Sequence, residues 1–348
     1  MSRESNNGVI IIAEAGVNHN GSLEKAKELI DVAAQSGADY IKFQTFKAEL
    51  SISKVAKKAN YQAENTSDSE ESQLDMVKKL EIAFEDHHRL ISYCRDAGIK
   101  FLSTGLDPKS LSFLHGLDLD LVKIPSGEIN NQIYLEQVGT WGKPTLLSTG
   151  MSNLADIERA LNILYASGTE RSNVTVLHCN TEYPTPFEDV NLKAMNTIGQ
   201  AFGVKIGYSD HTMGIEVPIA AVALGATVIE KHFTLDRNLP GPDHKASLEP
   251  QELKSMVSAI RNIEQAISGS GLKEPSASER GNTDIARKSI HLKQDMPCGT
   301  AIEKGHLIMT RPGNGISPLD YRKVLGMAVN KDTKAGQILN WEDLKPLK

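Results

Sequence analysis

The chain has 348 residues, of which 40% are hydrophobic and 24% are charged, and its formal net charge at pH 7 is −6. This length and apolar content suffice for one large core and a small second domain. The net negative charge argues against a generally basic surface that would bind nucleic acid or an anionic membrane. An anionic ligand therefore needs local positive charge in a pocket. The three cysteines form no Cys-x-x-Cys pair, which argues against a disulfide framework or a zinc ribbon.

The N-terminal segment is polar and lacks the apolar stretch of a signal peptide. Apolar runs such as Val9–Ala13 are too short to span a bilayer. We therefore expect a cytoplasmic protein that has neither a membrane nor a nucleic acid as its partner.

Short β-branched runs alternate along the chain with longer segments of helical periodicity, a pattern typical of βα units around a parallel sheet. The runs predict eight strands, at Val9–Ala13, Asp39–Phe43, Lys100–Leu102, Leu119–Ile124, Thr145–Leu147, Val174–Leu177, Lys205–Tyr208 and Thr227–Ile229. The segments between and after them predict helices at Leu23–Gln35, Glu85–Ala97, Lys109–Leu114, Ile133–Gly139, Leu154–Ala166, Leu192–Phe202, Ile215–Ala223 and Pro250–Ser268.

Eight strand–helix units in this length predict an α/β fold of the (β/α)₈ type, a TIM barrel, over residues 1–268. A doubly wound open sheet is the competing architecture. Residues 269–284 are polar and begin with glycine and serine, as expected of a linker, and residues 285–348 predict a small, mostly β domain with strands at Ser289–Leu292 and His306–Thr310. The long polar segment Ala48–Asp75 is typical of a lid or binding loop.

Polar side chains stand at the end of every predicted barrel strand. In a TIM barrel the carboxyl ends of the strands form the active site. The strand-end residues, in chain order, are Glu14, Lys42, Gln44, Ser103, Thr104, Lys123, Ser126, Glu128, Ser148, Thr149, His178, Asn180, Tyr183, Ser209, Asp210, His211, Glu230 and His232. A succession of ionisable residues at eight strand ends indicates a site.

Two histidines, His211 and His232, end adjacent strands, so their imidazoles can converge on one metal ion whose coordination substrate and water complete. Few protein ligands, with oxygen donors supplied from elsewhere, suit Mn²⁺ or Mg²⁺ rather than tightly held Zn²⁺. The alternative is a pair of hydrogen-bonded structural histidines.

Two lysines, Lys42 and Lys123, lie within otherwise near-apolar strands. A buried ammonium is costly without a partner, so both are expected to face a ligand with more than one negative charge. The hydroxyl groups of Ser126, Ser148 and Ser209 can donate hydrogen bonds to the oxygen atoms of this ligand. Two alternatives stay open: structural ion pairs with strand-end carboxylates, and a Schiff-base role for Lys123 in an aldolase.

Motifs spread over nearly the whole chain resemble, in order, those of the sialic acid synthase family. They are Glu14-Ala-Gly-Val-Asn-His-Asn-Gly21, Lys42-Phe-Gln-Thr45, Lys123-Ile-Pro-Ser-Gly-Glu128, Ser148-Thr-Gly-Met151, His178-Cys-Asn-Thr-Glu-Tyr-Pro-Thr-Pro186, Ser209-Asp-His-Thr212, Glu230-Lys-His-Phe233, Gly241-Pro-Asp243 and Arg311-Pro-Gly-Asn-Gly315. Members of this family have a TIM barrel followed by a small antifreeze-like (SAF) domain, so the resemblance implies the same two-domain fold here.

The resemblance implies condensation of phosphoenolpyruvate (PEP) with an open-chain N-acylmannosamine-type sugar, which releases phosphate and a nine-carbon 2-keto acid. It implies a divalent metal, Mn²⁺ or Mg²⁺, on His211 and His232 that polarises the sugar aldehyde. Attack leaves a cationic centre at PEP C2, which water traps before phosphate departs. Either Glu14 or Glu230 would manage that water and the alkoxide proton.

The resemblance also implies contacts for each substrate. The residues expected to hold PEP are Lys42, Thr104, Lys123, Ser126, Ser148, Asn180 and Ser209, and those expected to contact the sugar are Gln44, Glu128, Tyr183 and Asp243. Arg311, in the C-terminal domain, is expected to reach the sugar's N-acyl group in the partner subunit's active site. This contact implies a domain-swapped homodimer.

The chain departs from the family pattern after the third strand, where it has Ser103-Thr-Gly-Leu106 in place of the usual Ser-Thr-Pro-Phe. Thr104 is kept, while the loop that would fit the sugar differs. The stretch Ser126-Gly-Glu128 also differs from the Ser-Phe-Glu of pseudaminic acid synthases.

The opening motif, Glu71–Met76 and His244–Pro250 resemble legionaminic acid synthases. We therefore favour N,N'-diacetyllegionaminate, made from 2,4-diacetamido-2,4,6-trideoxymannose, as the product. N-acetylneuraminate, made from N-acetylmannosamine, is the alternative. A carbohydrate- or ice-binding protein is a non-enzymatic alternative, but a binder has no need of paired buried lysines.

Overall fold

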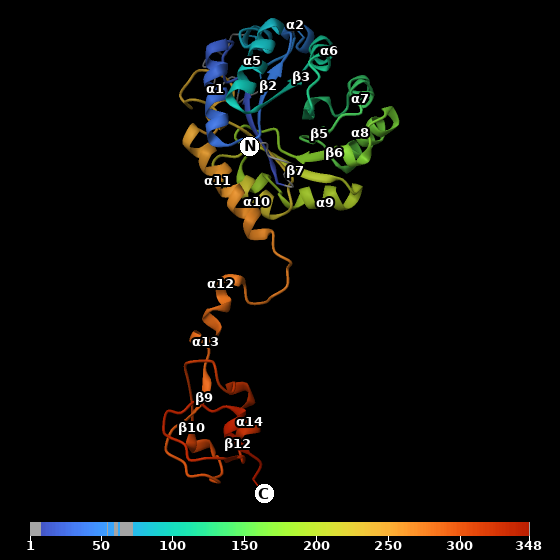
Figure 1. The fold of residues 1–348 in the computed structure, drawn as a ribbon. Coiled ribbons are helices and arrows are strands. Elements are labelled where there is room, and N and C mark those ends of the chain that lie inside the picture. The colour runs from blue at the N-terminus through green and yellow to red at the C-terminus, as the bar shows by residue number, and fades with distance from the viewer. Residues whose placement is uncertain (1–7, 54, 59–61, 63–71, 348) are drawn as a thin grey trace. The chain divides into compact units, whose positions relative to one another are not determined.

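The computed structural model describes residues 8–53, 55–58, 62 and 72–347. The chain divides into two compact units between Gly269 and Ser270 (Figure 1), and each unit is described by itself. In the described part of the chain, no helix combines the length and the apolar character needed to cross a membrane.

The first unit is built on eight parallel strands. They are β1 (Ile10–Gly16), β2 (Tyr40–Thr45), β3 (Lys100–Gly105), β4 (Val122–Ile124), β5 (Thr145–Ser148), β6 (Val174–His178), β7 (Lys205–Asp210) and β8 (Val228–His232). Their order is β3-β2-β1-β8-β7-β6-β5-β4, and β3 and β4, at its two ends, are neighbours. The sheet is therefore closed: the predicted TIM barrel is confirmed, and the doubly wound open sheet is wrong.

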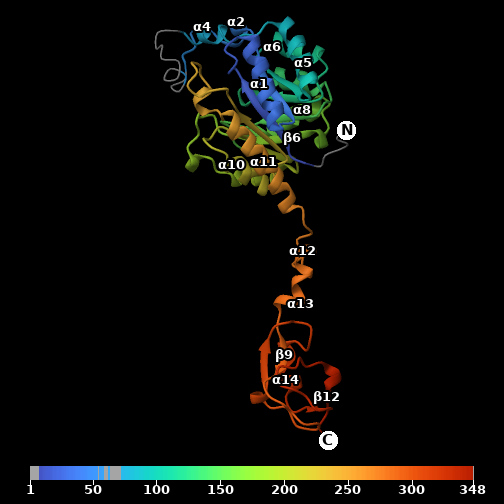
Figure 2. The same cartoon turned by 60° about the vertical axis from the view of Figure 1, so that its left-hand side comes forward.

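Helices surround this barrel (Figures 1 and 2). They are α1 (Leu23–Ser36), α5 (Phe84–Ala97), α6 (Pro108–Gly116), α7 (Gln132–Gly139), α8 (Leu154–Ser167), α9 (Lys193–Phe202), α10 (Glu216–Ala223) and α11 (Pro250–Ile267). Short 3₁₀ helices lie at Ser126–Glu128, Arg171–Asn173, Phe187–Asp189 and His244–Ala246. Local sequence sets the helix ends: the Ser22 side chain accepts a hydrogen bond from the Lys25 N–H at the start of α1, and Gly37 ends α1 with φ +83°.

The segment Ala48–Asp75, predicted as a loop, contains α2 (Ala48–Ser51) and the start of α4 (Gln73–Lys78). These two short helices pack together. Residues 54, 59–61 and 63–71 of this segment lie outside the described residues.

Alternation along the strands decides which side chains point into the barrel. In β1, Ile11 and Ala13 belong to the cluster between strands and helices, whereas Ile12 belongs to a second cluster inside the barrel. Successive side chains of a strand point to opposite faces. Glu14 therefore faces the same interior as Ile12, one layer nearer the carboxyl end.

The same rule holds around the barrel. The interior cluster contains Tyr40, Leu102, Leu121, Leu146, Leu177 and Val228. The residues two positions further along are Lys42, Thr104, Lys123, Ser148, Cys179 and Glu230. An apolar layer in the barrel thus lies beneath a layer of polar side chains.

Most observed strands run further toward their carboxyl ends than predicted. β1 continues to Gly16, β3 to Gly105, β7 to Asp210 and β8 to His232. Strand β4 instead begins late, at Val122, after a turn in which Asp118 has φ +52°. The residues added at the carboxyl ends are largely those of the site.

The second unit contains two antiparallel pairs, β9 (Ser289–Leu292) with β10 (Leu307–Thr310) and β11 (Ala328–Val329) with β12 (Leu344–Lys345). This unit also contains the short helix α14 (Tyr321–Val324) and 3₁₀ helices at Lys304–His306, Pro318–Asp320 and Trp341–Asp343. Ten buried side chains, among them Ile290 and Leu339, form its own apolar core.

The range predicted as a linker overlaps two short helices, α12 (Ala277–Arg280) and α13 (Asn282–Ala286). The first is nucleated by a capping box between Ser276 and Glu279.

Candidate active site

The polar layer of the barrel lines an open cavity of about 630 Å³, here called the central cavity. The predicted residues that line it are Glu14, Lys42, Gln44, Thr104, Lys123, Ser126, Ser148, Tyr183, Ser209, His211, Glu230 and His232. The structure thus gathers side chains from β1 to β8 at one place, as the strand-end pattern predicts.

Two lysines and two carboxylates form a buried charge cluster on the wall of this cavity. Lys42 Nζ lies 2.7 Å from Glu14 Oε2 and 3.7 Å from Glu230 Oε2, and Lys123 Nζ lies 3.1 Å from Glu230 Oε1. The side chains of all four are at most 5% exposed. Since two positive charges face two potential negative charges, an anionic ligand must compete with Glu230 for both ammonium groups.

These ion pairs are also the contacts expected of the structural alternative. What favours a ligand site is their position beside open space. In addition, the buried Ser148 hydroxyl, which lines the same cavity, has no hydrogen-bond partner among the described residues. A polar atom buried without a partner costs free energy, and a ligand oxygen would remove that cost.

Opposite pKa shifts distinguish the two carboxylates. Burial raises the pKa of Glu14 to about 7, against the opposing effect of Lys42. Burial also acts on Glu230, but Lys123 and Lys42 outweigh it and lower its pKa to about 2. Near neutral pH the two carboxylates therefore differ in their readiness to take up a proton.

Neutral hydroxyl groups complete the wall around the lysines. Lys42 Nζ donates to Thr104 Oγ1 at 3.3 Å, and Ser209 Oγ donates to Glu230 Oε1 at 2.9 Å. Ser126 Oγ accepts from the Gly150 N–H at 2.9 Å. Such groups are suited to the oxygens of a phosphate or carboxylate.

His211 and His232 lie side by side, with ring centroids 5.5 Å apart. The Nδ1 of His211 hydrogen-bonds to the backbone carbonyl of Asn180, which leaves Nε2 free for another partner. The Nδ1 of His232 is buried without a hydrogen-bond partner among the described residues.

Burial lowers the pKa of His211 to about 4 and that of His232 well below its usual range. Both rings are therefore neutral at physiological pH, as metal ligation requires. No group of three or more His, Cys, Asp or Glu side chains in the described ranges is arranged to hold a metal. The pair fits an ion that takes its remaining ligands from substrate and water.

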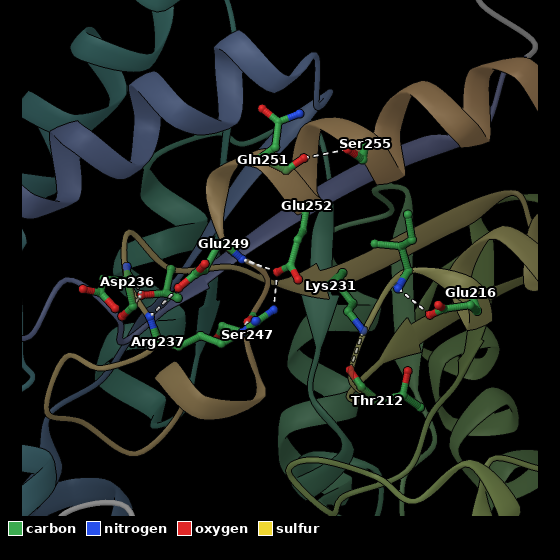
Figure 3. A network of polar contacts seen from close by, with 12 residues as sticks. Thr212, Glu216, Lys231, Asp236, Arg237, Ser247, Glu249, Gln251, Glu252 and Ser255 are labelled. Atoms are coloured by element: carbon green, nitrogen blue, oxygen red, sulfur yellow. Dashed lines mark hydrogen bonds and ion pairs between the residues drawn. The ribbon is translucent and has the colours of Figure 1, made fainter.

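A separate buried ion pair, between Lys231 and Asp210, lies next in sequence to this histidine pair. Lys231 Nζ donates to Asp210 Oδ2 and to the Thr212 carbonyl, a contact that Figure 3 shows. Asp210 in turn accepts from the Thr212 N–H at 3.0 Å. Because Asp210 precedes His211 and Lys231 precedes His232, this pair ties together the two strand ends that carry the histidines.

A second cavity, here called the side cavity, adjoins the central one. Four of the five residues predicted to contact a sugar line it, namely Gln44, Glu128, Tyr183 and Asp243. It shares Gln44, Leu106, Tyr183 and His232 with the central cavity. His232 therefore stands where the two cavities meet, with His211 beside it on the wall of the central cavity.

Asp243 is a buried carboxyl group on the wall of the side cavity, 8% exposed. Burial alone raises its pKa to about 6. A carboxylate without a compensating cation is an acceptor that sugar hydroxyl or amide N–H groups can satisfy.

Two predicted site residues lie elsewhere. The Asn180 side chain donates to the Asp189 carbonyl at 2.9 Å and lines a neighbouring cavity, so only its backbone carbonyl serves the histidine pair. Arg311 lies exposed in the second unit, where its Nε donates to the Ala286 carbonyl at 2.9 Å.

The cavities also include residues that the sequence did not indicate. Cys179 lines the central cavity with its Sγ 3.3 Å from Ser126 Oγ, and Met76 and Val77 of α4 line the side cavity. Cys179 stands two positions after the inward-facing Leu177, so alternation offered a signal for it. Met76 ends the Glu71–Met76 motif, which resembles legionaminic acid synthases but does not by itself place the residue at the barrel mouth.

Comparison with known proteins adds the family. A model of the NeuB family matches residues 29–273, and a model of the SAF domain matches residues 287–345. The chain is 53% identical to an N,N'-diacetyllegionaminic acid synthase of Campylobacter jejuni, with 95% of this chain and 98% of that protein covered. It is 45% identical to the N,N'-diacetyllegionaminic acid synthase of Legionella pneumophila, covering 99% and 96% of the two chains.

Among solved structures, the chain is similar to an N-acetylneuraminic acid synthetase of Leptospira borgpetersenii in complex with citrate. The TM-score is 0.70 at 35% identity, and the match covers 81% of this chain and 94% of that one. These matches agree in family and in domain order with the fold described above. The chain therefore belongs to the NeuB family of synthases and carries a SAF domain after its TIM barrel.

Proposed function

We propose that this enzyme condenses PEP with an open-chain N-acylated amino sugar of the mannosamine type, and that its favoured product is N,N'-diacetyllegionaminate. The observation that carries the proposal is the pair of buried lysines beside the histidine pair, at the junction of two cavities. The identity of 53% to a relative with that synthase activity in its name supports the choice of product.

In this proposal the central cavity holds PEP. Lys42 and Lys123 pair with its phosphate and carboxylate, and the hydroxyl groups of Thr104, Ser126, Ser148 and Ser209 donate to the remaining oxygens. The ligand takes over from Glu230 as the partner of the lysines. Binding at both ends fixes the methylene carbon of PEP toward the side cavity.

The side cavity holds the sugar, with its aldehyde at the junction and its hydroxyl and amide groups on Gln44, Glu128, Tyr183 and Asp243. The methylene carbon of PEP forms a bond to the aldehyde carbon, and the aldehyde oxygen takes up a proton. Water adds to C2 of PEP, and cleavage of the bond between C2 and the phosphate oxygen releases phosphate and leaves a ketone. Glu14 and Glu230 are the carboxylates that line the cavity and can hold or move these protons.

His211 and His232 would hold a divalent ion, Mn²⁺ or Mg²⁺, in the ligated enzyme. When bound, such an ion polarises the aldehyde oxygen of the sugar. We further propose a cytoplasmic, domain-swapped homodimer in which Arg311 of one subunit contacts the sugar's N-acyl group in the other.

A single assay tests the function: purified enzyme, PEP and Mn²⁺ with either 2,4-diacetamido-2,4,6-trideoxymannose or N-acetylmannosamine, with phosphate release followed over time. We expect turnover, with the trideoxy sugar preferred. Lack of turnover with both sugars would contradict the proposal.

A Schiff-base aldolase that uses Lys123 is the second candidate. The contact between Lys123 Nζ and Glu230 Oε1 at 3.1 Å argues against it, because this ion pair occupies the nitrogen that would have to attack the keto acid. Borohydride in the presence of a keto acid is expected to leave Lys123 unmodified. Covalent trapping together with turnover that resists EDTA would instead establish the aldolase.

A further inference from the structure

The side cavity has two chemically different walls. One carries the polar residues already described, including Glu128 and Asp243. The other carries an apolar patch, which consists of Phe46, Met76, Val77, Leu80 and Leu106. The cavity is also lined by the neutral polar residues Ser51, Gln62 and Gln73, and Gln73 Nε2 donates to Gln62 Oε1 at 3.3 Å. Phe46, Met76 and Leu80 are buried, with at most 7% of each residue exposed, so the patch presents a fixed surface rather than loose side chains.

Leu106 joins this patch to the barrel. It directly follows β3, where its N–H donates to the Thr45 carbonyl of the β2 end at 3.0 Å. Its side chain packs on the cluster of Val17, Phe46 and Leu80 and lines both cavities.

The α4 helix supplies the far side of the patch. The Ser72 side chain caps this helix by accepting from the Asp75 N–H, and Met76 and Val77 follow within it. Figure 2 shows α4 beside α2, against which it packs. The patch therefore combines the end of a barrel strand with a helix from the long segment after β2.

The direction in which the acceptor lies follows from the chemistry. Its aldehyde carbon must reach the junction of the two cavities, where PEP and His232 are. The opposite end of the open chain then extends into the side cavity, away from the lysines and toward the apolar patch. A hydroxyl group buried there without a partner loses its hydrogen bonds to water, whereas a methyl group loses nothing.

Charge restricts the acceptor as well. Among the described residues that line the side cavity there is no lysine or arginine, while Glu128 and Asp243 are both acidic. A phosphate on the far end of the sugar would therefore face carboxylates, neutral polar groups and apolar atoms, and none of these described residues supplies a cation to balance it.

We propose that this apolar patch, with Leu106 at its centre, determines acceptor specificity by binding carbon 6 of the sugar as a methyl group and excluding a 6-hydroxyl or a 6-phosphate. The inference rests on the proposed function and deepens it. It assigns the preference for a 6-deoxy sugar to named side chains of this chain.

The test uses acceptors that differ only at carbon 6: 2-acetamido-2,6-dideoxymannose, N-acetylmannosamine and N-acetylmannosamine 6-phosphate. The trideoxy diacetamido sugar is the positive control. For the full-length enzyme with PEP and Mn²⁺, we expect kcat/KM to be about 10- to 100-fold higher for the 6-deoxy sugar than for N-acetylmannosamine. The 6-phosphate is expected to give no measurable turnover.

Two substitutions place polar groups in the patch at similar volume, Leu106→Asn and Met76→Gln. Each is expected to lower the preference for the 6-deoxy sugar by roughly 10-fold, through the acceptor KM. Met76 lines the side cavity and not the central one, so Met76→Gln should leave the KM for PEP unchanged. Leu154→Asn is the matched control, since Leu154 lies at the same end of the barrel but lines the neighbouring cavity. It should leave the preference as in the wild type.

The possible outcomes distinguish failure of the specificity inference from failure of the proposed function. Turnover with an equal rate for the 6-deoxy and 6-hydroxy sugars, or a preference that survives both Leu106→Asn and Met76→Gln, would overturn the specificity inference alone. If one variant does not fold, the other decides. Lack of turnover with every acceptor, including the positive control, would overturn the proposed function and this inference with it.

Discussion

Lys231 and Asp210 form an ion pair in which both side chains are fully excluded from solvent, directly behind the two histidines of the site. Isolated buried ion pairs contribute little net stability, because desolvation offsets their attraction. This pair instead connects the β7 and β8 ends through the Thr212 carbonyl. Its place in the fold indicates a role in holding the positions of His211 and His232.

Lys231→Met should therefore destabilise the protein and weaken metal binding together. Removing one partner leaves Asp210 as an unpaired buried charge, with an expected cost of about 3–5 kcal/mol in the free energy of unfolding. The measurements are urea unfolding and the apparent Kd for Mn²⁺. Arg261→Lys alters an ion pair with Asp39 remote from the site and should leave the Mn²⁺ affinity unchanged. Equal Mn²⁺ affinities in all three proteins would mean that Lys231 does not position the histidines.

The histidine pair predicts metal-dependent activity. Chelation by EDTA should stop phosphate release, and Mn²⁺ should restore it. His211→Ala and His232→Ala should each lower kcat/KM at low Mn²⁺ by more than about 100-fold, because loss of a direct ligand exceeds the usual effect of losing a residue that only supports one. Circular dichroism should show an intact fold. His178→Ala is the control, since His178 bonds to the Val190 carbonyl and lines the neighbouring cavity.

We predict that the Asp243 carboxylate lowers the free energy of unfolding at high pH while it contributes to acceptor binding. Its pKa is raised from 3.8 to about 6 in the folded protein, so the folded state binds the proton more tightly than the unfolded state does. The stability that this provides is complete below pH 3.8 and is lost as pH rises through 6. Asp243→Asn should thus gain about 3 kcal/mol over the wild type at pH 8 and little at pH 3.

The same substitution should raise the acceptor KM, while the KM for PEP is unaffected. Thermal unfolding across pH and steady-state kinetics at pH 8 measure the two effects. A pH-independent difference in stability between the two proteins would show that Asp243 is ionised in the folded state at the same pH as in the unfolded one.

Arg311 predicts a contribution from the SAF domain to sugar binding. Arg311→Ala should raise the acceptor KM by roughly 10- to 100-fold, the usual effect of losing a hydrogen bond from a charged donor, with a much smaller change in the KM for PEP. Arg322→Ala, another exposed arginine of the same unit, is the control. Similar effects on both substrates would argue against an N-acyl contact. Analytical ultracentrifugation tests the dimer on which this role depends.

The barrel was predictable because its signal is local and repeated. Each strand is a short β-branched run followed by a helix of ordinary period, and caps such as Ser22 mark the helix starts. The predicted strands end too early because polar residues such as Glu14 and His232 interrupt the apolar run. In the barrel those residues still belong to strands, because alternation continues into a polar layer that faces the cavity.

Two parts of the site were not accessible to that reasoning. The apolar patch contains Met76, which directly follows the segment predicted to be a loop and comes to the barrel mouth through tertiary packing of α4 on α2. The motif that contains Asn180 predicts a PEP contact for its side chain, and it gives no sign that Nδ2 donates to the Asp189 carbonyl while Oδ1 has no hydrogen-bond partner among the described residues. A motif gives the identity of a residue, but the direction of its side chain depends on the backbone path of the loop after β6, which brings the Asp189 carbonyl close to Asn180.

The loop after β6 orients His211 through its main chain. The atom that orients His211 is the Asn180 carbonyl oxygen, which every amino acid carries. The protonated nitrogen of His211 is therefore specified by the course of the main chain, and substitution at position 180 can alter the side chain without disturbing it. The tautomer of His211 therefore depends on the residues that fix the path of this loop, and not on which side chain stands at position 180.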